Sequence, residues 1–82
     1  MSGFRKIDPL LLEVFVAIAD SGSFAAAADR VGRTKSAVSM QMKRLETLFE
    51  HNPIFEYQGR TKRLTAHGEQ LLAHARIILQ LN

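Results

Sequence analysis

The chain has 82 residues, of which 46% are hydrophobic and 23% charged, and its formal net charge is +3. This balance is typical of one small globular domain rather than a disordered segment, and the absence of cysteine excludes both disulfides and a thiolate zinc site. No apolar run approaches the ~20 residues that span a bilayer and no secretory leader is recognisable, so we expect a cytoplasmic protein with no membrane partner.

The first two helices are predicted by their caps and by the spacing of apolar residues. Asp8 can accept from free backbone N–H groups, and Pro9 loses nothing at the first helical position. Apolar residues then recur on one side of a helix that ends at Ser21-Gly22: Leu12, Phe15, Val16 and Ala19. Ser23 starts a second helix with the same spacing: Phe24, Ala27, Ala28 and Val31.

A third helix is predicted over residues 35–50, after a break at Gly32 and a cap at Thr34, and Pro53 prevents its continuation. Its core-facing residues are Val38, Met42, Leu45 and Phe49. Another side of the same helix is mostly polar or basic: Lys35, Ser36, Ser39, Met40 and Lys43. Residues 24–43 therefore have the pattern of a helix-turn-helix.

Two short strands, 54–57 and 62–65, are expected to pair through a turn at residues 58–61 that contains Gly59. We call this hairpin, residues 54–65, the wing. Thr65 can cap a last helix over residues 66–82, whose apolar arc still continues where the chain stops. The arc is wide enough for one side to pack on the core of the domain and the other on a second subunit, and simple core packing is the alternative for these residues. The candidates for the second subunit are Leu72, Ala75, Ile78 and Leu79.

Basic residues gather in two stretches without acids, at residues 30–44 and 57–64. A solvated surface is the ordinary explanation, but the coincidence with the helix-turn-helix favours a DNA-binding face. A helix in the major groove contacts bases from its N-terminal turns, so Lys35 is the best candidate to donate to guanine O6 or N7. Met40 either packs on a thymine methyl group or is a spare core residue. The further candidates for bases or phosphates are Ser36 and Ser39.

Phosphate contacts are expected at helix starts and at basic side chains. The candidates are Ser23, Thr34 and Lys43, together with the wing residues Arg60, Lys62 and Arg63, which can reach either a backbone phosphate or the minor groove. Arg33 is a further candidate for contact with DNA. For Arg63 a surface ion pair is an equal alternative. His67 and His74 lie too far apart for one metal ion, and no serine elbow or glycine-rich phosphate loop is present, so neither a metal site nor catalytic residues are expected, and we expect no enzyme.

Several motifs follow one another in a characteristic order. They are Leu12-x-x-Phe15, Ser23-Phe24-x-x-Ala27-Ala28, Ala37-Val38-Ser39-x-Gln41-x-x-x-Leu45-Glu46 and Phe55-x-x-x-Gly59-x-x-x-x-Leu64-Thr65. Over about residues 7–80 the chain resembles the N-terminal DNA-binding domain of LysR-type transcriptional regulators. Such regulators often have Gln-Pro where this chain has Lys35-Ser36, and Arg where it has Met40, so base preferences are not carried over.

The resemblance implies a mainly α winged helix-turn-helix fold, with a three-helix core, a two-stranded β wing and a C-terminal linker helix. The DNA-binding domain would span residues 7–65, and residues 66–82 would begin the linker and dimerisation helix, with the effector-binding domain absent from this chain. The implied partner is double-stranded promoter DNA with a partly palindromic site, bound by a homodimer through the linker helix, with a tetramer as an option at full length. No cofactor is implied in this domain; a small-molecule effector is implied for the full-length protein, in the bacterial cytoplasm at the nucleoid.

Two other functions compete with DNA binding. A winged-helix protein-interaction module would have no DNA affinity, and the basic stretch at residues 30–44 argues against it. An RNA-binding winged helix would present exposed aromatic side chains for stacking on bases, and Tyr57 is the one plausible candidate.

Overall fold

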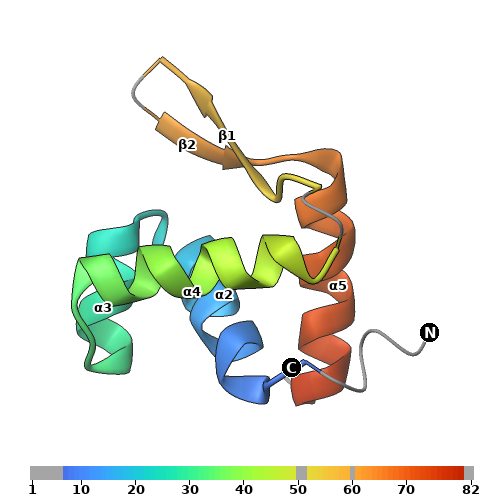
Figure 1. Cartoon of the computed structure of the whole chain (residues 1–82), viewed down its shortest axis with the longest axis horizontal. Coiled ribbons are helices and arrows are strands. Elements are labelled where there is room, and N and C mark those ends of the chain that lie inside the picture. The colour runs from blue at the N-terminus through green and yellow to red at the C-terminus, as the bar shows by residue number, and fades with distance from the viewer. Residues whose placement is uncertain (1–6, 50–51, 60, 81–82) are drawn as a thin grey trace.

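The computed structural model describes residues 7–49, 52–59 and 61–80 of the chain. These residues form helices followed by a β hairpin and a last helix, as predicted (Figure 1). The elements in chain order are α2 (Pro9–Ser21), α3 (Phe24–Val31), α4 (Lys35–Thr47), β1 (Phe55–Gln58), β2 (Thr61–Leu64) and α5 (Ala66–Leu79). The fold is a mainly α winged helix-turn-helix, which confirms the predicted class.

Each of these helices begins at the side-chain cap that the sequence predicts. A backbone N–H two or three residues further on donates to the cap oxygen, which satisfies one of the unpaired donors of a helix start. The caps and their distances are Asp8 to Leu10 at 3.0 Å, Ser23 to Ala26 at 3.0 Å, Thr34 to Ala37 at 3.1 Å and Thr65 to Gly68 at 3.0 Å. Thr34 therefore fixes the start of α4, the end of the helix that is expected to contact DNA.

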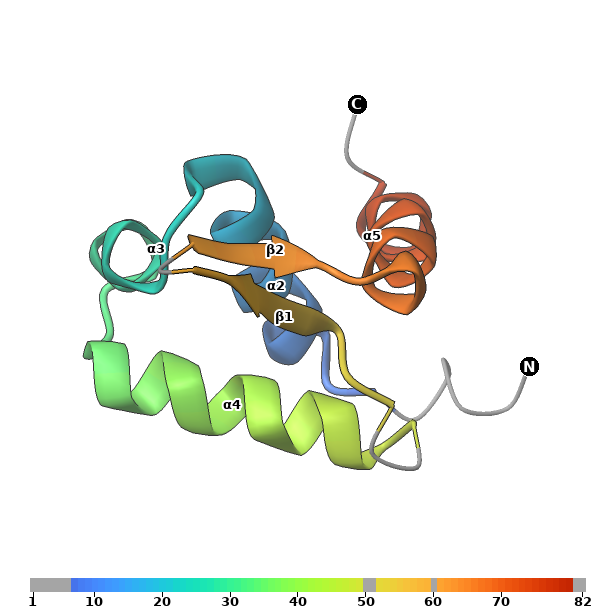
Figure 2. The ribbon, with the colours of Figure 1, turned by 90° about the horizontal axis from the view of Figure 1, so that it is seen from above.

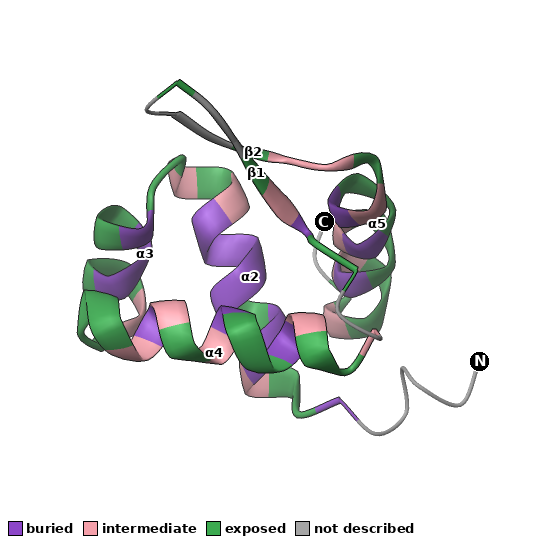
Figure 3. Ribbon diagram, turned by 45° about the horizontal axis from the view of Figure 1, so that its top comes forward, coloured by how far each residue is buried: buried purple, intermediate pink, exposed green. Residues whose placement is uncertain are grey.

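Helix α2 lies at the centre of the domain and packs against α3, α4 and α5. Figure 3 shows that most of its surface is buried. Phe15 is fully buried, and the same hydrophobic core includes Val38 and Leu45 of α4 and Leu71 of α5. Burial of such side chains is the main favourable term in folding, so α2 is the support on which α4 is held.

The wing is attached to this core by aromatic side chains. The ring of Phe55 lies edge-on to Phe15 and to Phe24, with centroid distances of 5.7 Å and 5.4 Å. Such T-shaped pairs are a favoured arrangement of aromatic rings. Ile54, just before β1, is fully buried.

The turn of the wing is shorter than predicted. Strand β1 pairs antiparallel with β2, and the register runs from Phe55 opposite Leu64 to Gln58 opposite Thr61. Only residues 59 and 60 lie between the strands, not the four residues 58–61. Gly59 has a φ of 63°, which suits the twist of two-residue hairpin turns. The predicted strand residues Ile54 and Thr65 lie outside the strands but still share a hydrogen bond of 3.1 Å, from the Thr65 N–H to the Ile54 carbonyl.

Helix α4 ends at Thr47 rather than at residue 50, which lies outside the described residues. The backbone tightens there, because the N–H of Phe49 donates to the carbonyl of Glu46 at 3.0 Å, a three-residue step. The Glu46 carboxylate accepts from the N–H of Ile54 at 3.0 Å. The end of α4 is thus tied to the segment that enters the wing.

Candidate nucleic-acid interface

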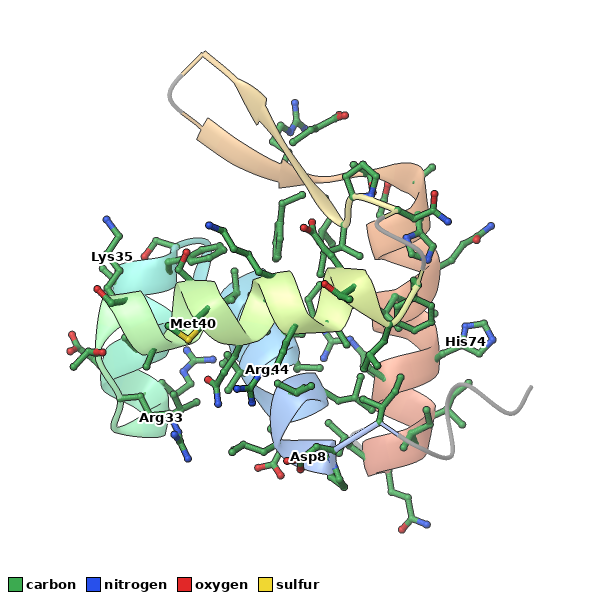
Figure 4. The ribbon with its side chains drawn as sticks, in the orientation of Figure 1. Asp8, Arg33, Lys35, Met40, Arg44 and His74 are labelled. Atoms are coloured by element: carbon green, nitrogen blue, oxygen red, sulfur yellow. The ribbon has the colours of Figure 1, made fainter. Side chains whose placement is uncertain are left out.

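The outer face of α4 consists of the five residues that the sequence places away from the core. They line one shallow surface depression: Lys35, Ser36, Ser39, Met40 and Lys43. Four of them are exposed, and Ser39 is half-buried. Figure 4 shows Lys35 projecting at the start of α4 and Met40 on its outer side. The structure therefore brings together the predicted base-contacting residues on one convex element.

The opposite side of α4 holds this face in place. Val38 and Leu45 are fully buried and Met42 is 3% exposed. These residues recur at helical spacing, so one side of α4 is apolar and packed while the other is polar and open to solvent. A helix with such a division can insert its outer face into a groove without disturbing the core.

Positive charge lies on the outer face of α4 and on the side next to it. All five basic residues between positions 30 and 44 are exposed: Arg30, Arg33, Lys35, Lys43 and Arg44. Arg30 lies apart from the other four, because it lines a separate depression together with Asp20 and Leu79. Arg33 and Arg44 lie on the side of α4 away from the wing, near Asp8 (Figure 4). The summed field of such a cluster attracts a polyanion.

The predicted phosphate contacts Ser23 and Thr34 are exposed, and both act as helix caps. In a cap the hydroxyl oxygen accepts a hydrogen bond, which leaves the O–H proton free to donate to another acceptor. Both residues therefore combine a structural role with a donor at a helix N-terminus, the position that favours an anion.

The wing supplies the remaining predicted contacts. Both views show the hairpin leaning toward the α3 end of α4 (Figures 1 and 2). Arg63 is exposed on β2; it pairs in the register with Glu56 and lines a depression together with Glu69, so the ion-pair alternative has acidic neighbours at hand. Lys62 stands opposite Tyr57 in the register, and Arg60 lies outside the described residues.

The predicted dimer contacts on α5 need one correction and one addition. Ala75 is fully buried in the core of its own domain, so its side chain is not available to a second subunit. Leu72 and Leu79 are partly buried against the same core, whereas Ile78 is 41% exposed. Ile77 is 73% exposed and is a further candidate for this contact. The sequence offers one signal for it, since Ile77 lies two residues from the core-facing Ala75 and therefore about 200° around the helix from that side chain.

Among the described residues no group of three or more His, Asp or Glu side chains could hold a metal ion. His74 shares a hydrogen bond with the carbonyl of Gln70 at 2.9 Å, and the ring of His67 packs edge-on against Phe49. In the same part of the chain, no helix has both the length and the apolar character needed to cross a membrane.

The structure has the three parts of a winged helix-turn-helix domain. Helix α2 forms the buried support, α4 presents an exposed polar and basic face, and a β hairpin adjoins it. The model of the bacterial regulatory helix-turn-helix proteins of the lysR family matches residues 10–69. The chain belongs to this family.

Curated relatives agree with this assignment. The chain is 55% identical over 77 residues to the HTH-type transcriptional regulator PecT of Dickeya dadantii, an alignment that covers 94% of this chain and 24% of that protein. It is 49% identical over 76 residues to the HTH-type transcriptional regulator DgdR of Burkholderia cepacia, covering 93% of this chain and 26% of that protein. The chain thus spans about a quarter of the length of these relatives.

Solved structures share the fold. The chain in the CbnR_DBD–DNA complex superposes with a TM-score of 0.83 at 35% identity, covering 92% of this chain and 85% of that one. The BenM_DBD/catB site 1 DNA complex gives a TM-score of 0.83 at 26% identity, with 90% and 81% covered.

Proposed function

We propose that this domain binds double-stranded DNA in a sequence-specific manner, with α4 in the major groove and the wing on the backbone or in the minor groove. The observation that carries the proposal is the outer face of α4, where exposed polar and basic side chains stand on a helix whose other side is buried. The similar domains of CbnR and BenM were solved as DNA complexes, which supports the same partner here.

Within this proposal Lys35 donates to guanine O6 or N7, because it lies in the first turn of α4, from which base edges are reached. Ser36 and Ser39 follow on the same face and donate to bases or phosphates. Lys43 is two turns further along and contacts a phosphate. The remaining DNA contacts are Ser23, Arg33 and Thr34, together with the wing residues Arg60, Lys62 and Arg63, which reach a phosphate or the minor groove.

The oligomer and its regulation are part of the same proposal. A homodimer would form through the exposed apolar end of α5 and bind a partly palindromic promoter site, because two-fold protein symmetry matches two half-sites. The full-length protein would be a dimer or a tetramer, and a small-molecule effector would act on it. The protein would act in the bacterial cytoplasm at the nucleoid.

Selection of binding sites from random double-stranded DNA tests the proposal. The wild-type chain should enrich one sequence, and its affinity should fall steeply with salt. Lys35→Ala should cost about 1–3 kcal/mol at the selected site and relax the preference at one base position. Lys43→Ala is the matched control, since loss of a phosphate contact weakens all sequences alike and lowers the salt slope by about one.

Two results would count against parts of this assignment. If Lys35→Ala weakens every sequence equally, Lys35 contacts a phosphate and not a base. If the wild-type chain shows no salt-dependent affinity for DNA, the domain is a protein-interaction module instead.

A further inference from the structure

Met40 is an apolar side chain at the centre of a polar face. It is 62% exposed, whereas the other residues that line its depression are two lysines and two serines. Single exposed apolar residues are common on protein surfaces and need no explanation by themselves. What distinguishes Met40 is its place on the outward side of α4, where the proposed ligand would lie (Figure 4).

Folding gives no reason for a methionine at this position. Met40 lies two residues from both Val38 and Met42, so it points about 200° around the helix from each of these buried side chains. It does not belong to the hydrophobic core or to the partly buried residues packed against that core. The alternative of a spare core residue is therefore excluded.

The chemistry of the major groove supplies a partner. Three of the four DNA bases are recognised there by donors and acceptors alone, which the lysines and serines around Met40 can match. The C5 methyl group of thymine is the apolar feature of that groove. A thioether chain with three rotatable bonds adapts its shape to such a contact.

We propose that Met40 is a specificity-determining residue that recognises the C5 methyl group of thymine. The inference rests on the proposed function, since it needs α4 in the major groove. It concerns one base pair, near the middle of the stretch of DNA that α4 would contact.

Removal of the methyl group alone provides the test. In the site selected by the wild-type chain, each thymine is replaced in turn by deoxyuridine, which keeps the base-pairing edge and lacks the methyl. At one position this change should weaken wild-type binding roughly fourfold, the value expected when one buried carbon is removed from an interface. Met40→Ala should bind the thymine and deoxyuridine sites equally at that position.

Two further variants sharpen the comparison. Met40→Gln keeps the length of the side chain but makes its end polar, and it should also lose the discrimination. Leu48→Ala is the matched control, because Leu48 is 51% exposed and apolar on the turn after α4 but lies outside the depression. It should keep the full difference between thymine and deoxyuridine. Circular dichroism confirms that each variant is folded.

The inference is overturned if no thymine position responds in the wild-type chain, or if the response is the same in Met40→Ala, which would assign the methyl contact to another residue. These results would leave sequence-specific DNA binding intact. Absence of any selected site would instead overturn the proposed function, and this inference with it.

Discussion

Gly68 shows how a single residue fixes the junction between the wing and α5. A Cβ atom there would lie far inside contact distance of the Ile54 carbonyl oxygen, and 3.2 Å from Cδ2 of Leu64. The position is helical and its φ is not left-handed, so close approach of the two backbones, not conformational freedom, requires glycine. Local sequence gives no reason for this glycine, because the atoms that exclude a side chain there belong to residues 54 and 64.

Gly68→Ala should therefore destabilise the domain, although alanine is the better helix former by about 0.8–1 kcal/mol. Displacement of the Ile54 backbone should cost about 1–3 kcal/mol, as for other overpacked sites. Urea unfolding followed by circular dichroism measures the difference. Ala73→Gly is the control at an exposed position of the same helix, where only the loss of helix propensity is expected. A Gly68→Ala chain as stable as the wild type would show that the junction can move.

At the scale of elements, α2 and α5 are joined outside the core by an ion pair. The guanidinium of Arg76 donates to the Asp20 carboxylate at 2.5 Å, and both side chains are partly exposed. This hydrogen bond, aided by the charges of Arg76 and Arg30, lowers the pKa of Asp20 below its ordinary value of 3.8. A carboxyl group with a lowered pKa stabilises the fold above that ordinary value and loses this effect as the pH falls through its folded-state pKa.

Asp20→Asn should accordingly lower Tm at pH 7, by a small amount because the pair is open to solvent. The difference from the wild type should shrink as the pH is lowered from about 4, where Asp20 takes up a proton in the unfolded chain but not yet in the folded one. It should also shrink in 1 M NaCl at pH 7, because salt screens exposed pairs. Thermal melts across this pH range make the comparison, with Glu13→Gln on the outside of α2 as the control for loss of one charge. A constant difference at every pH would contradict the assignment.

The helix starts were predictable from the sequence, but some of the helix and strand ends were not. Each start depends on one hydroxyl or carboxylate within three residues of the N–H that it accepts from, which is local information. The end of α4 and the two-residue turn of the wing depend on contacts across the fold, such as Glu46 to Ile54. The residues on the outer face of α4 were predictable, because at helical spacing they fall on the side opposite the apolar residues that face the core. The burial of Ala75 was not, because it depends on how α5 packs on α2.

At the scale of the whole molecule, the end of α5 is the surface that the proposed function assigns to a second subunit. Ile77 and Ile78 form an exposed apolar pair there, and water is a poor environment for two adjacent isoleucines. Ile77→Asp should raise the dimer dissociation constant by at least about tenfold, because the interface would then bury an unpaired charge. Sedimentation over a concentration series measures this constant.

The choice of residue matters for that experiment. Leu72 and Leu79 pack against the core, so an aspartate there would damage the fold as well as the interface. Leu48→Asp provides the control, since it places the same charge on an exposed apolar position that lines a different depression, together with Asp8 and Arg44. Equal sedimentation of Ile77→Asp and the wild type would exclude this surface from the dimer.

The hydrogen bond between the Glu46 carboxylate and the Ile54 N–H has a consequence for the shape of the DNA. It joins the end of α4 to the residue that precedes β1. The ring of Phe55 in β1 packs against Phe15 and so fixes the wing to α2 as well. The span between the two proposed groove contacts is therefore set by the protein. A duplex that does not match this span has to bend or change its groove width, at a cost that depends on its base steps. Base pairs that lie between the two contacts, and touch no side chain, would then still affect affinity through their stiffness.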